Sequence, residues 1–488
     1  MTTRYMPLEV SAAPPRVLDF ASLKRGFFFL AVALMAVAPF SQDPLAMSVG
    51  AAVPWLIMQL INRPGMPAGV IFILLYQWLQ IFARVLQSMV DGEPMAASLV
   101  GPNVGRAYWY MMASLVVIAL ALRLTLGNLK DSSDRAHFDW RPIDIFTLYV
   151  VMMFVAVACR YATKVLPGLD QPIDALAKMK IVLLFMMFTT VMTTGRNANL
   201  MWVAVGLEIV MGFTGILSDF RSVFIYLAIA AVASRIPLKG SYIAVGAICA
   251  GALLGLALFW TAVKMEYREY VTGGTDQAIK VDVEDRLGYL GNRVASSDEI
   301  DWGQAAYLLL IRLAYTDIFG SVIGVQESSP EPEVMRQWQD AIDHVTRPRF
   351  LFPGKAALSD SDVYVRLARG NPSEEVRLGT SISVGYMAEN FVDLGFPGML
   401  IGCFVLGVLL GLVIRYFMTL KFPWILREGV VLAFALNVFL NGVETSLPKV
   451  LGAAVMFFIV YALLARFAFP IGLKWLKGRS PVPQAQIP

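Results

Sequence analysis

Residues 241–263 read SYIAVGAICAGALLGLALFWTAV and contain no charged side chain. A helix rises about 1.5 Å per residue, so about 20 such residues span the apolar core of a bilayer. Similar stretches recur along the 488-residue chain, of which 57% is hydrophobic and only 16% is charged. Soluble domains have about 25% charged residues. The composition therefore excludes a soluble enzyme and a disordered chain, and it predicts an all-α polytopic membrane protein.

About twelve transmembrane helices are expected from the apolar stretches. Nine of them lie within residues 1–263 and three within residues 384–488. The stretches cover residues 26–40, 45–62, 67–87, 107–126, 143–159, 179–195, 198–217, 222–238, 241–263, 396–416, 429–447 and 450–470. The first two are short and also fit a single broken hairpin.

Lysine and arginine are distributed unevenly between the two sides of this layout. With the N-terminus inside, the cytoplasmic segments hold 19 of them, and the short outer loops with their adjoining helix ends hold 8. Basic residues collect on the cytoplasmic side of membrane proteins. We therefore expect both termini to be cytoplasmic.

Residues 264–383 form the segment that differs most from the rest. They carry 13 basic and 19 acidic side chains, or about 27% charged residues against about 12% elsewhere, and about 25% is usual for a soluble domain. We expect an extracytoplasmic loop domain. Within it, residues 304–324 are apolar enough to enter lipid, but a crossing there would place the basic C-terminus outside. An interfacial or re-entrant helix is therefore expected near 304–324. One stripe of that helix would hold Leu308, Arg312, Tyr315 and Phe319.

Few residues are suited to binding a metal or a nucleotide. Three cysteines are widely separated in the sequence, and the two histidines are His137 and His344. This spacing argues against a structural metal or a disulfide framework. No nucleotide-binding loop or common hydrolase motif is present.

Several glycine pairs have the GxxxG spacing that lets helices approach closely. We interpret them as packing sites without chemistry. The pairs are Gly251/Gly255, Gly398/Gly402 and Gly407/Gly411.

The segment EVRLGTSISVGYMAENFVDLGFPGML, residues 375–400, leads from the loop into an apolar stretch. If residues 383–394 are helical, four polar side chains share one face, together with a nearby Arg377. Two carboxylates beside an arginine can supply a base and an anion clamp. The alternative is a solvated helix start that ends in a break at Gly395 and Pro397. The four side chains are Tyr386, Glu389, Asn390 and Asp393.

Other charged residues have two interpretations each. Arg221 begins a span, where it can bind a lipid phosphate or serve as an interface anchor paired with Asp219. The run His344-Val-Thr-Arg347-Pro-Arg349 fits an anion site with a titratable neighbour, or a solvated turn.

Glu208 lies in the middle of the stretch NLMWVAVGLEIVMGF. An ionisable residue inside the membrane is costly and suggests function, such as proton-coupled transport. The alternative is a structural pair, for which Arg84 is a possible partner.

The layout resembles the Wzy-type polymerases of O-antigen and exopolysaccharide repeat units, which are related in architecture to the O-antigen ligases. The resemblance rests on many spans, one large late outer loop, an arginine that begins a span, and YMAENFVDLGFPG at 386–398. The family often has Gly-Ser-Arg where this chain has Asp219-Phe220-Arg221.

The resemblance implies glycosyl transfer at the outer face of the bacterial inner membrane. Donor and acceptor would be undecaprenyl-diphosphate-linked oligosaccharides, and neither a cofactor nor a metal would be needed. Membrane lipids would surround the protein, a chain-length regulator and a flippase would be its partners, and no nucleic acid would bind. An O-antigen ligase, and a polysaccharide exporter or secondary transporter, remain open as alternatives.

The same resemblance suggests roles for the charged residues. One of Glu389, Asp393 and His344 is expected to act as the base that accepts the proton of the acceptor hydroxyl. The residues expected to bind the diphosphate or the glycan are Arg221, Arg312, Arg377, Arg347, Arg349 and Tyr386.

Overall fold

The structure is a computed structural model. It describes residues 17–479 except 99, 128, 131–139, 166–167, 214–219, 274–279, 348–350, 353, 356–358 and 371–381, and except the side chains of 160–165. Within these residues every regular element is a helix, and extended pairing is limited to a bridge between Val17 and Pro237. The predicted all-helical fold class is therefore confirmed.

Each apolar stretch predicted to span the membrane contains a helix. Their bounds are α1 (Phe20–Val37), α2 (Pro44–Ile61), α3 (Gly69–Asp91), α4 (Asn103–Leu126), α5 (Pro142–Val165), α7 (Met179–Thr194), α8 (Ala198–Phe213), α9 (Arg221–Ala233), α10 (Gly240–Thr272), α16 (Tyr386–Thr419), α17 (Trp424–Phe439) and α18 (Leu447–Arg479). The short helix α6 (Asp170–Ala177) precedes α7, and the 3-10 turn η6 (Gly442–Glu444) precedes α18.

Nine helices in the described residues are long and apolar enough to cross a membrane. In this measure α1 includes the turn that follows it, and α6 with α7 counts as one helix. The predicted spans that fall short are α8, α9 and α17, with 16, 13 and 16 residues. The chain is thus a helical multi-pass membrane protein.

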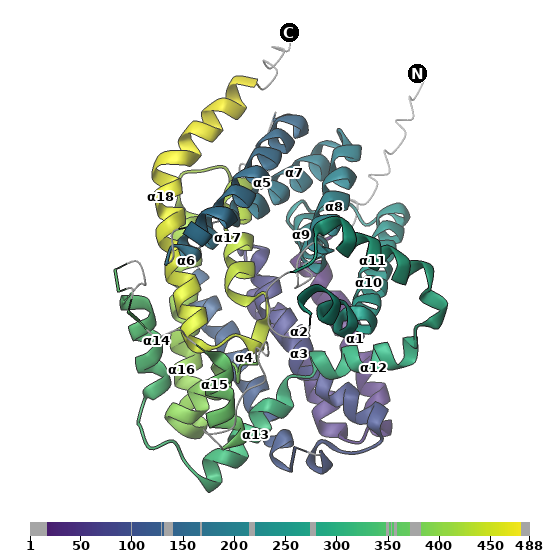
Figure 1. Ribbon diagram of the computed structural model, residues 1–488, viewed down its shortest axis with the longest axis vertical. Helices are drawn as coiled ribbons and strands as arrows, with labels where there is room; N and C mark the ends of the chain where they lie inside the picture. Colours follow the sequence, from purple (N-terminus) through teal and green to yellow (C-terminus); the bar gives the residue numbers. More distant parts are fainter. Residues whose placement is uncertain are drawn as a thin grey trace, which may run out of the picture.

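The described residues of the predicted loop domain also form helices. Their bounds are α11 (Val283–Ala295), α12 (Trp302–Leu313), α13 (Thr316–Ser328), α14 (Arg336–Thr346), α15 (Asp360–Tyr364) and the π-helical turn η5 (Val365–Arg369). The end of α18 lies at the top of Figure 1, and α13, α14 and α15 lie toward the bottom. These parts of the loop domain therefore lie at the opposite end of the bundle from the end of the last helix.

The expected single helix over 304–324 is in fact two helices. A bend of 48° separates α12 from α13. The stripe expected across the bend is therefore wrong, because Leu308 is exposed on α12 while Phe319 is buried in the core. Tertiary contacts hold the bend: the backbone N–H of Tyr315 donates to the carbonyl of Gln80 at 3.4 Å, and its hydroxyl donates to the carbonyl of Ser383.

The long helix α16 contains a break at Gly395, where the alternative of a solvated helix start had placed one. Gly395 has φ 61° and ψ −172°, a conformation that favours glycine, and Pro397 follows it. Phe396 stacks on Tyr110 of α4, with 4.1 Å between the ring centroids. The residues of α16 before Gly395 therefore run in a different direction from the membrane-spanning residues after it, and Gly395 and Pro397 cause this change.

The glycine pairs have different environments. Gly407 and Gly411 lie against α4: a Cβ at either would be 2.8 Å from Ala121 and 2.7 Å from Thr125, respectively. Here the predicted close packing is confirmed. In contrast, no atom lies within 4 Å of a Cβ built at Gly251 or Gly255, so that pair makes no close packing within the described chain.

Candidate functional site

Four basic side chains and one carboxylate interact electrostatically where α3, α9, α10, α12 and η6 come together. They are Arg221, Lys264, Arg268, Arg312 and Glu444, and we call them the basic cluster. Glu444 interacts electrostatically with three of these cations, and Arg268 interacts with Arg312. Three of the positive charges thus lie near the one carboxylate, and the fourth, Arg268, lies near Arg312 and Lys264. Such an excess attracts an anion, because the like charges repel one another without one.

Arg221 is positioned by hydrogen bonds from its guanidinium group. It donates to the hydroxyl of Tyr76 at 3.1 Å and to the carbonyl of Leu440 at 3.1 Å. A third contact reaches Oδ1 of Asn441 at 3.4 Å. As the first residue of α9, Arg221 can point beyond the helix into the basic cluster. Asp219, its possible partner from the sequence, lies outside the described residues.

Gln80 fixes the turn that carries Glu444. Its side-chain oxygen accepts the backbone N–H of Val443 at 2.9 Å, and its amide donates to Glu444 Oε1 at 3.3 Å. Gly442 has φ 63°, and a Cβ there would collide with the Gln80 amide. Only glycine therefore suits this position, since it accepts the positive φ and leaves room for Gln80.

Glu444 lies in the connection between α17 and α18 and is partly buried. Burial raises the pKa of Glu444 above its ordinary value, although the neighbouring cations act to lower it. A carboxylate with a raised pKa is a stronger base, and the nearby cations favour its ionised form.

Lys264 and Arg268 come from the last part of α10. The domain boundary expected at residue 263 falls inside this helix, which continues to Thr272. The spacing of four residues places the two side chains on one face. Arg268 Nε is buried without a hydrogen-bond partner in the described residues. An unsatisfied buried guanidinium N–H is costly, and a bound anion would satisfy it.

Arg312 completes the basic cluster from α12, which packs against both α3 and α10. Its side chain is exposed and forms neither a hydrogen bond nor an ion pair within the described part of the chain. Its guanidinium N–H groups are therefore available to a ligand. The structure thus brings together Arg221 and Arg312, two residues that the sequence analysis expected to bind the diphosphate or the glycan.

The predicted polar face of α16 exists, but it is used for packing. Tyr386 donates its hydroxyl to Oε1 of Gln77 at 2.5 Å, and Glu389 accepts the backbone N–H of Leu447. Glu389 is 1% exposed, so the alternative of a solvated helix start is wrong. The backbone N–H of Tyr386 donates to the carbonyl of Thr445 at 2.8 Å. This face of α16 therefore packs against the end of the η6 turn, next to Glu444.

Asp393 and Asn390 on the same face hold α14. Asp393 accepts the backbone N–H groups of Gln337 at 3.1 Å and Trp338 at 2.9 Å, at the start of that helix. Asn390 accepts the indole N–H of Trp338 at 3.0 Å. A carboxylate at a helix N-terminus stabilises the helix. The geometry of Asp393 is that of a helix cap.

The remaining predicted residues lie apart from the basic cluster or outside the described residues. His344 Nε2 lies 2.9 Å from the side-chain nitrogen of Gln171, on α14 where it packs against α6 and α18. Arg347 forms an exposed pair with Asp343 at 3.5 Å. Arg349 and Arg377 lie outside the described residues. The expected anion site at 344–349 is therefore not part of the basic cluster.

Glu208 forms a buried pair inside the bundle. It accepts hydrogen bonds from Lys180 Nζ and from the hydroxyl of Tyr149, both at 2.8 Å. The sequence analysis named Arg84 as a possible partner of Glu208, and this was wrong, because Arg84 forms an ion pair with Asp317 at 2.7 Å. These contacts favour the structural interpretation of Glu208.

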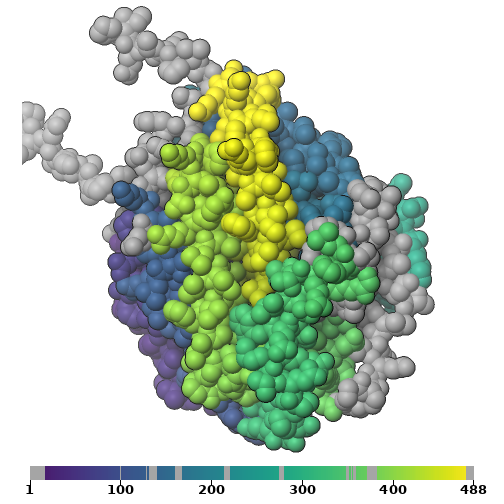
Figure 2. Space-filling model, turned by 90° about the vertical axis from the view of Figure 1, so that its left-hand side faces the viewer, coloured from purple at the N-terminus to yellow at the C-terminus, as the bar shows by residue number. Residues whose placement is uncertain are grey.

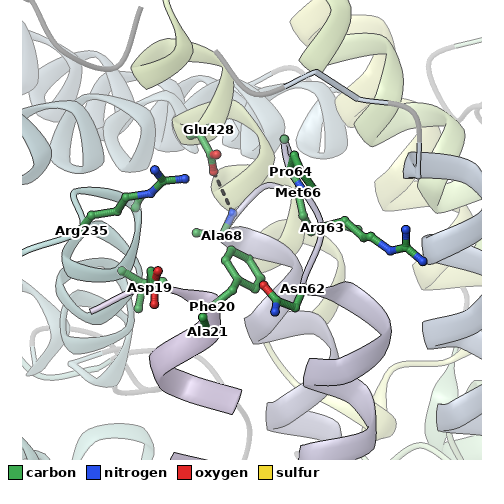
Figure 3. A pocket seen from close by; sticks show the side chains of 13 residues that line it. Asp19, Phe20, Ala21, Asn62, Arg63, Pro64, Met66, Ala68, Arg235 and Glu428 are labelled. Atoms are coloured by element: carbon green, nitrogen blue, oxygen red, sulfur yellow. Dashed lines mark hydrogen bonds between the residues drawn. The ribbon is translucent and has the colours of Figure 1, made fainter. Parts of the chain in front are cut away.

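A second polar recess lies at the other end of α9. It has a volume of about 220 Å³ and is lined by both polar and apolar residues from four segments. In Figure 3 Glu428 points toward the backbone N–H of Ala68, which donates to it at 2.8 Å. Asp19 and Arg235 also line the recess. Acids and cations are mixed here, so the recess lacks the positive excess of the basic cluster.

Sequence reasoning missed Lys264, Arg268 and Glu444. The spacing of Lys264 and Arg268 directly after the span 241–263 was a usable signal, as was an acid, Glu444, near the end of the expected span 429–447. No group of three histidine, cysteine or acidic side chains suited to a metal occurs in the described ranges. No family model, curated protein or solved structure matches the chain.

Proposed function

We propose that the protein is a polysaccharide polymerase of the bacterial cytoplasmic membrane. It would transfer undecaprenyl-diphosphate-linked oligosaccharide repeat units onto one another at the outer face. The observation that carries this proposal is the basic cluster, which combines four cations with one carboxylate, three of the cations lying near that carboxylate. A departing diphosphate is a multiply charged anion, and preorganised cations stabilise such a group as its charge develops.

The cations would act on the donor. Arginine matches phosphate oxygens with two parallel N–H groups, and Arg268 and Arg312 both have unused N–H groups in the described residues. Lys264 would add a point charge beside them. Arg221 is held by Tyr76 and Leu440, so its direction is set before substrate binds. A preorganised site loses less energy to rearrangement.

Glu444 would act on the acceptor, in place of Glu389, Asp393 or His344. The acceptor hydroxyl oxygen bonds to the anomeric carbon of the donor as the bond from that carbon to the diphosphate oxygen breaks. The electron pair leaves with the diphosphate, and the hydroxyl proton passes to Glu444. The other three candidates make packing contacts outside the basic cluster.

The proposed orientation has both termini in the cytoplasm and residues 264–383 outside. In this orientation the outer end of α10, the start of α9 and η6 all face the same side as the loop domain. The basic cluster would then be open to lipid-linked substrates from the outer leaflet. A flippase would supply these substrates, and a chain-length regulator would act on the growing polymer.

Polymer formation by purified protein in lipid nanodiscs, supplied with lipid-linked repeat units, tests the proposal. Arg312→Ala should reduce the rate by about 100-fold or more. Arg312→Lys should also be impaired, because a lysine loses the paired N–H geometry. The matched control is Arg106→Ala, which removes an exposed pair with Glu327 and should leave the rate unchanged.

The products separate the alternatives. Transfer of the glycan only to a lipid A core would identify a ligase. Movement of the glycan across proteoliposomes without a new glycosidic bond would identify an exporter or transporter. If folded Arg312→Ala protein formed polymer at the rate of the wild type, the basic cluster would not be the active site.

A further inference from the structure

An apolar groove runs between α5, α7 and α18. It has a volume of about 190 Å³, and every residue that lines it is apolar. Three of the lining residues are methionines, Met152, Met179 and Met186, whose flexible side chains adapt to irregular ligands. In Figure 2 α18 is the yellow helix, and the blue segment beside its upper part belongs to the region of α5 and α7. The groove is therefore a surface feature of the bundle within the apolar helices.

Charged residues lie just beyond the lining residues at one end of this groove. Asp144 lies one turn before the lining residue Leu148 on α5, and Arg479 lies three residues after the lining residue Leu476 on α18. Asp144 is paired with Arg141 at 2.8 Å and with Arg479 at 3.5 Å. Its side chain is 4% exposed.

The two arginines keep donors available to a ligand. Their side chains are 49% and 51% exposed, while the carboxylate between them is buried. One carboxylate offsets one of the two positive charges, so a net positive charge remains. Lys474 and Lys477 are exposed on the same end of α18 and add to it. The guanidinium carbon of Arg479 also lies 4.4 Å from the ring centroid of Trp475. Tryptophan and basic residues together are typical of the membrane–water interface.

We propose that this groove is a binding site for an anionic phospholipid of the surrounding bilayer. One acyl chain lies in the groove, and the phosphate contacts Arg141 and Arg479. A transmembrane helix of another protein does not fit, because a helix is about 10 Å across and the recess is only about 190 Å³. Basic pockets between membrane helices on the side rich in lysine and arginine bind anionic headgroups. This site is independent of the proposed catalytic function.

Native mass spectrometry of the full-length protein tests the proposal. Phosphatidylglycerol and phosphatidylcholine with identical acyl chains are titrated into detergent-solubilised protein. We expect the anionic lipid to bind about tenfold more tightly, because each nearby arginine or lysine adds to the attraction. The double variant Arg141→Ala/Arg479→Ala should lower the affinity for phosphatidylglycerol to that for phosphatidylcholine.

The groove itself is tested by Gly472→Phe. Gly472 lines the groove, and no atom lies within 4 Å of a Cβ built there, so the new ring can fill the groove without a backbone clash. Both lipids should then lose their tight site. Gly246→Phe is the matched control, since Gly246 is exposed on α10 and equally unobstructed. It should bind both lipids as the wild type does.

Two outcomes would overturn the proposal. If the wild type bound the two lipids with equal affinity, the site would not recognise the anionic headgroup. Unchanged lipid binding by Gly472→Phe, with the thermal unfolding midpoint of the wild type, would place the lipid elsewhere.

Discussion

Arg84 and Asp317 form an ion pair of 2.7 Å that joins the middle of α3 to the first turn of α13. Asp317 is the second residue of α13, and Arg312 is the last but one of α12. The pair therefore holds the bend between the two helices from one side. It sets the direction in which α12 carries Arg312 to the basic cluster.

Asp317→Ala should lower the free energy of unfolding by about 3 kcal/mol, because it leaves a buried cation without its partner. The Arg84 side chain is only 4% exposed. Thermal unfolding of purified protein measures the loss. The double variant Arg84→Leu/Asp317→Leu should regain most of the stability, since no charge stays buried. An unchanged unfolding midpoint in Asp317→Ala would show that the pair does not hold the bend.

The rate of polymer formation should depend on pH through Glu444. A base is active when ionised, so the rate should rise with pH through the pKa of Glu444. Burial raises this pKa, so the rise should lie above the ordinary range near pH 4.3. Arg221 lowers the pKa, so Arg221→Met should move the rise to higher pH. Rates measured across pH for the wild type and both Arg221→Met and Glu444→Gln check this. A rise that persists in Glu444→Gln would assign it to another group.

Gly442→Ala should impair both activity and stability. The new alanine has to adopt φ 63°, and its Cβ collides with the Gln80 amide. The free energy of unfolding should therefore fall by about 2 kcal/mol or more, and Glu444 should be displaced. Gly92→Ala is the matched control, because Gly92 has φ 72° but no atom within 4 Å of a Cβ. It should lose only about 1 kcal/mol and retain full activity. Equal effects of the two variants would mean that the contact with Gln80 is unimportant.

The two glycine pairs should respond differently to larger side chains. Gly411→Leu should destabilise the protein by about 3 kcal/mol or more, because α4 lies directly against it. Gly255→Leu should change stability little, since the same substitution on α10 meets no atom within 4 Å. Thermal unfolding in one detergent compares them. Similar midpoints for the two variants would contradict the close packing of α4 and α16.

The helices of the apolar stretches could be predicted because they depend on local chemistry. Apolar stretches become helices because backbone N–H and C=O groups in lipid have to be satisfied within the segment. The break in α16 follows from Gly395 and Pro397, which act on their own backbone. The shared face of Tyr386, Glu389 and Asp393 follows from helical spacing alone.

What that face contacts could not be predicted, and neither could the full candidate site. Glu389 meets the backbone of Leu447, and Asp393 caps α14, because of how distant helices pack together. The bend before Tyr315 also depends on Gln80, more than 200 residues earlier in the chain.

The sequence by itself determined which apolar stretches are helical and where charge is concentrated, since both are properties of neighbouring residues. Only the tertiary structure decided that Arg221, Arg312 and Glu444 come together. They lie on three segments far apart in the chain, and spacing within a segment says nothing of how one helix is rotated against another. That rotation is set by packing across the whole bundle, such as the seating of Gly407 and Gly411 on α4.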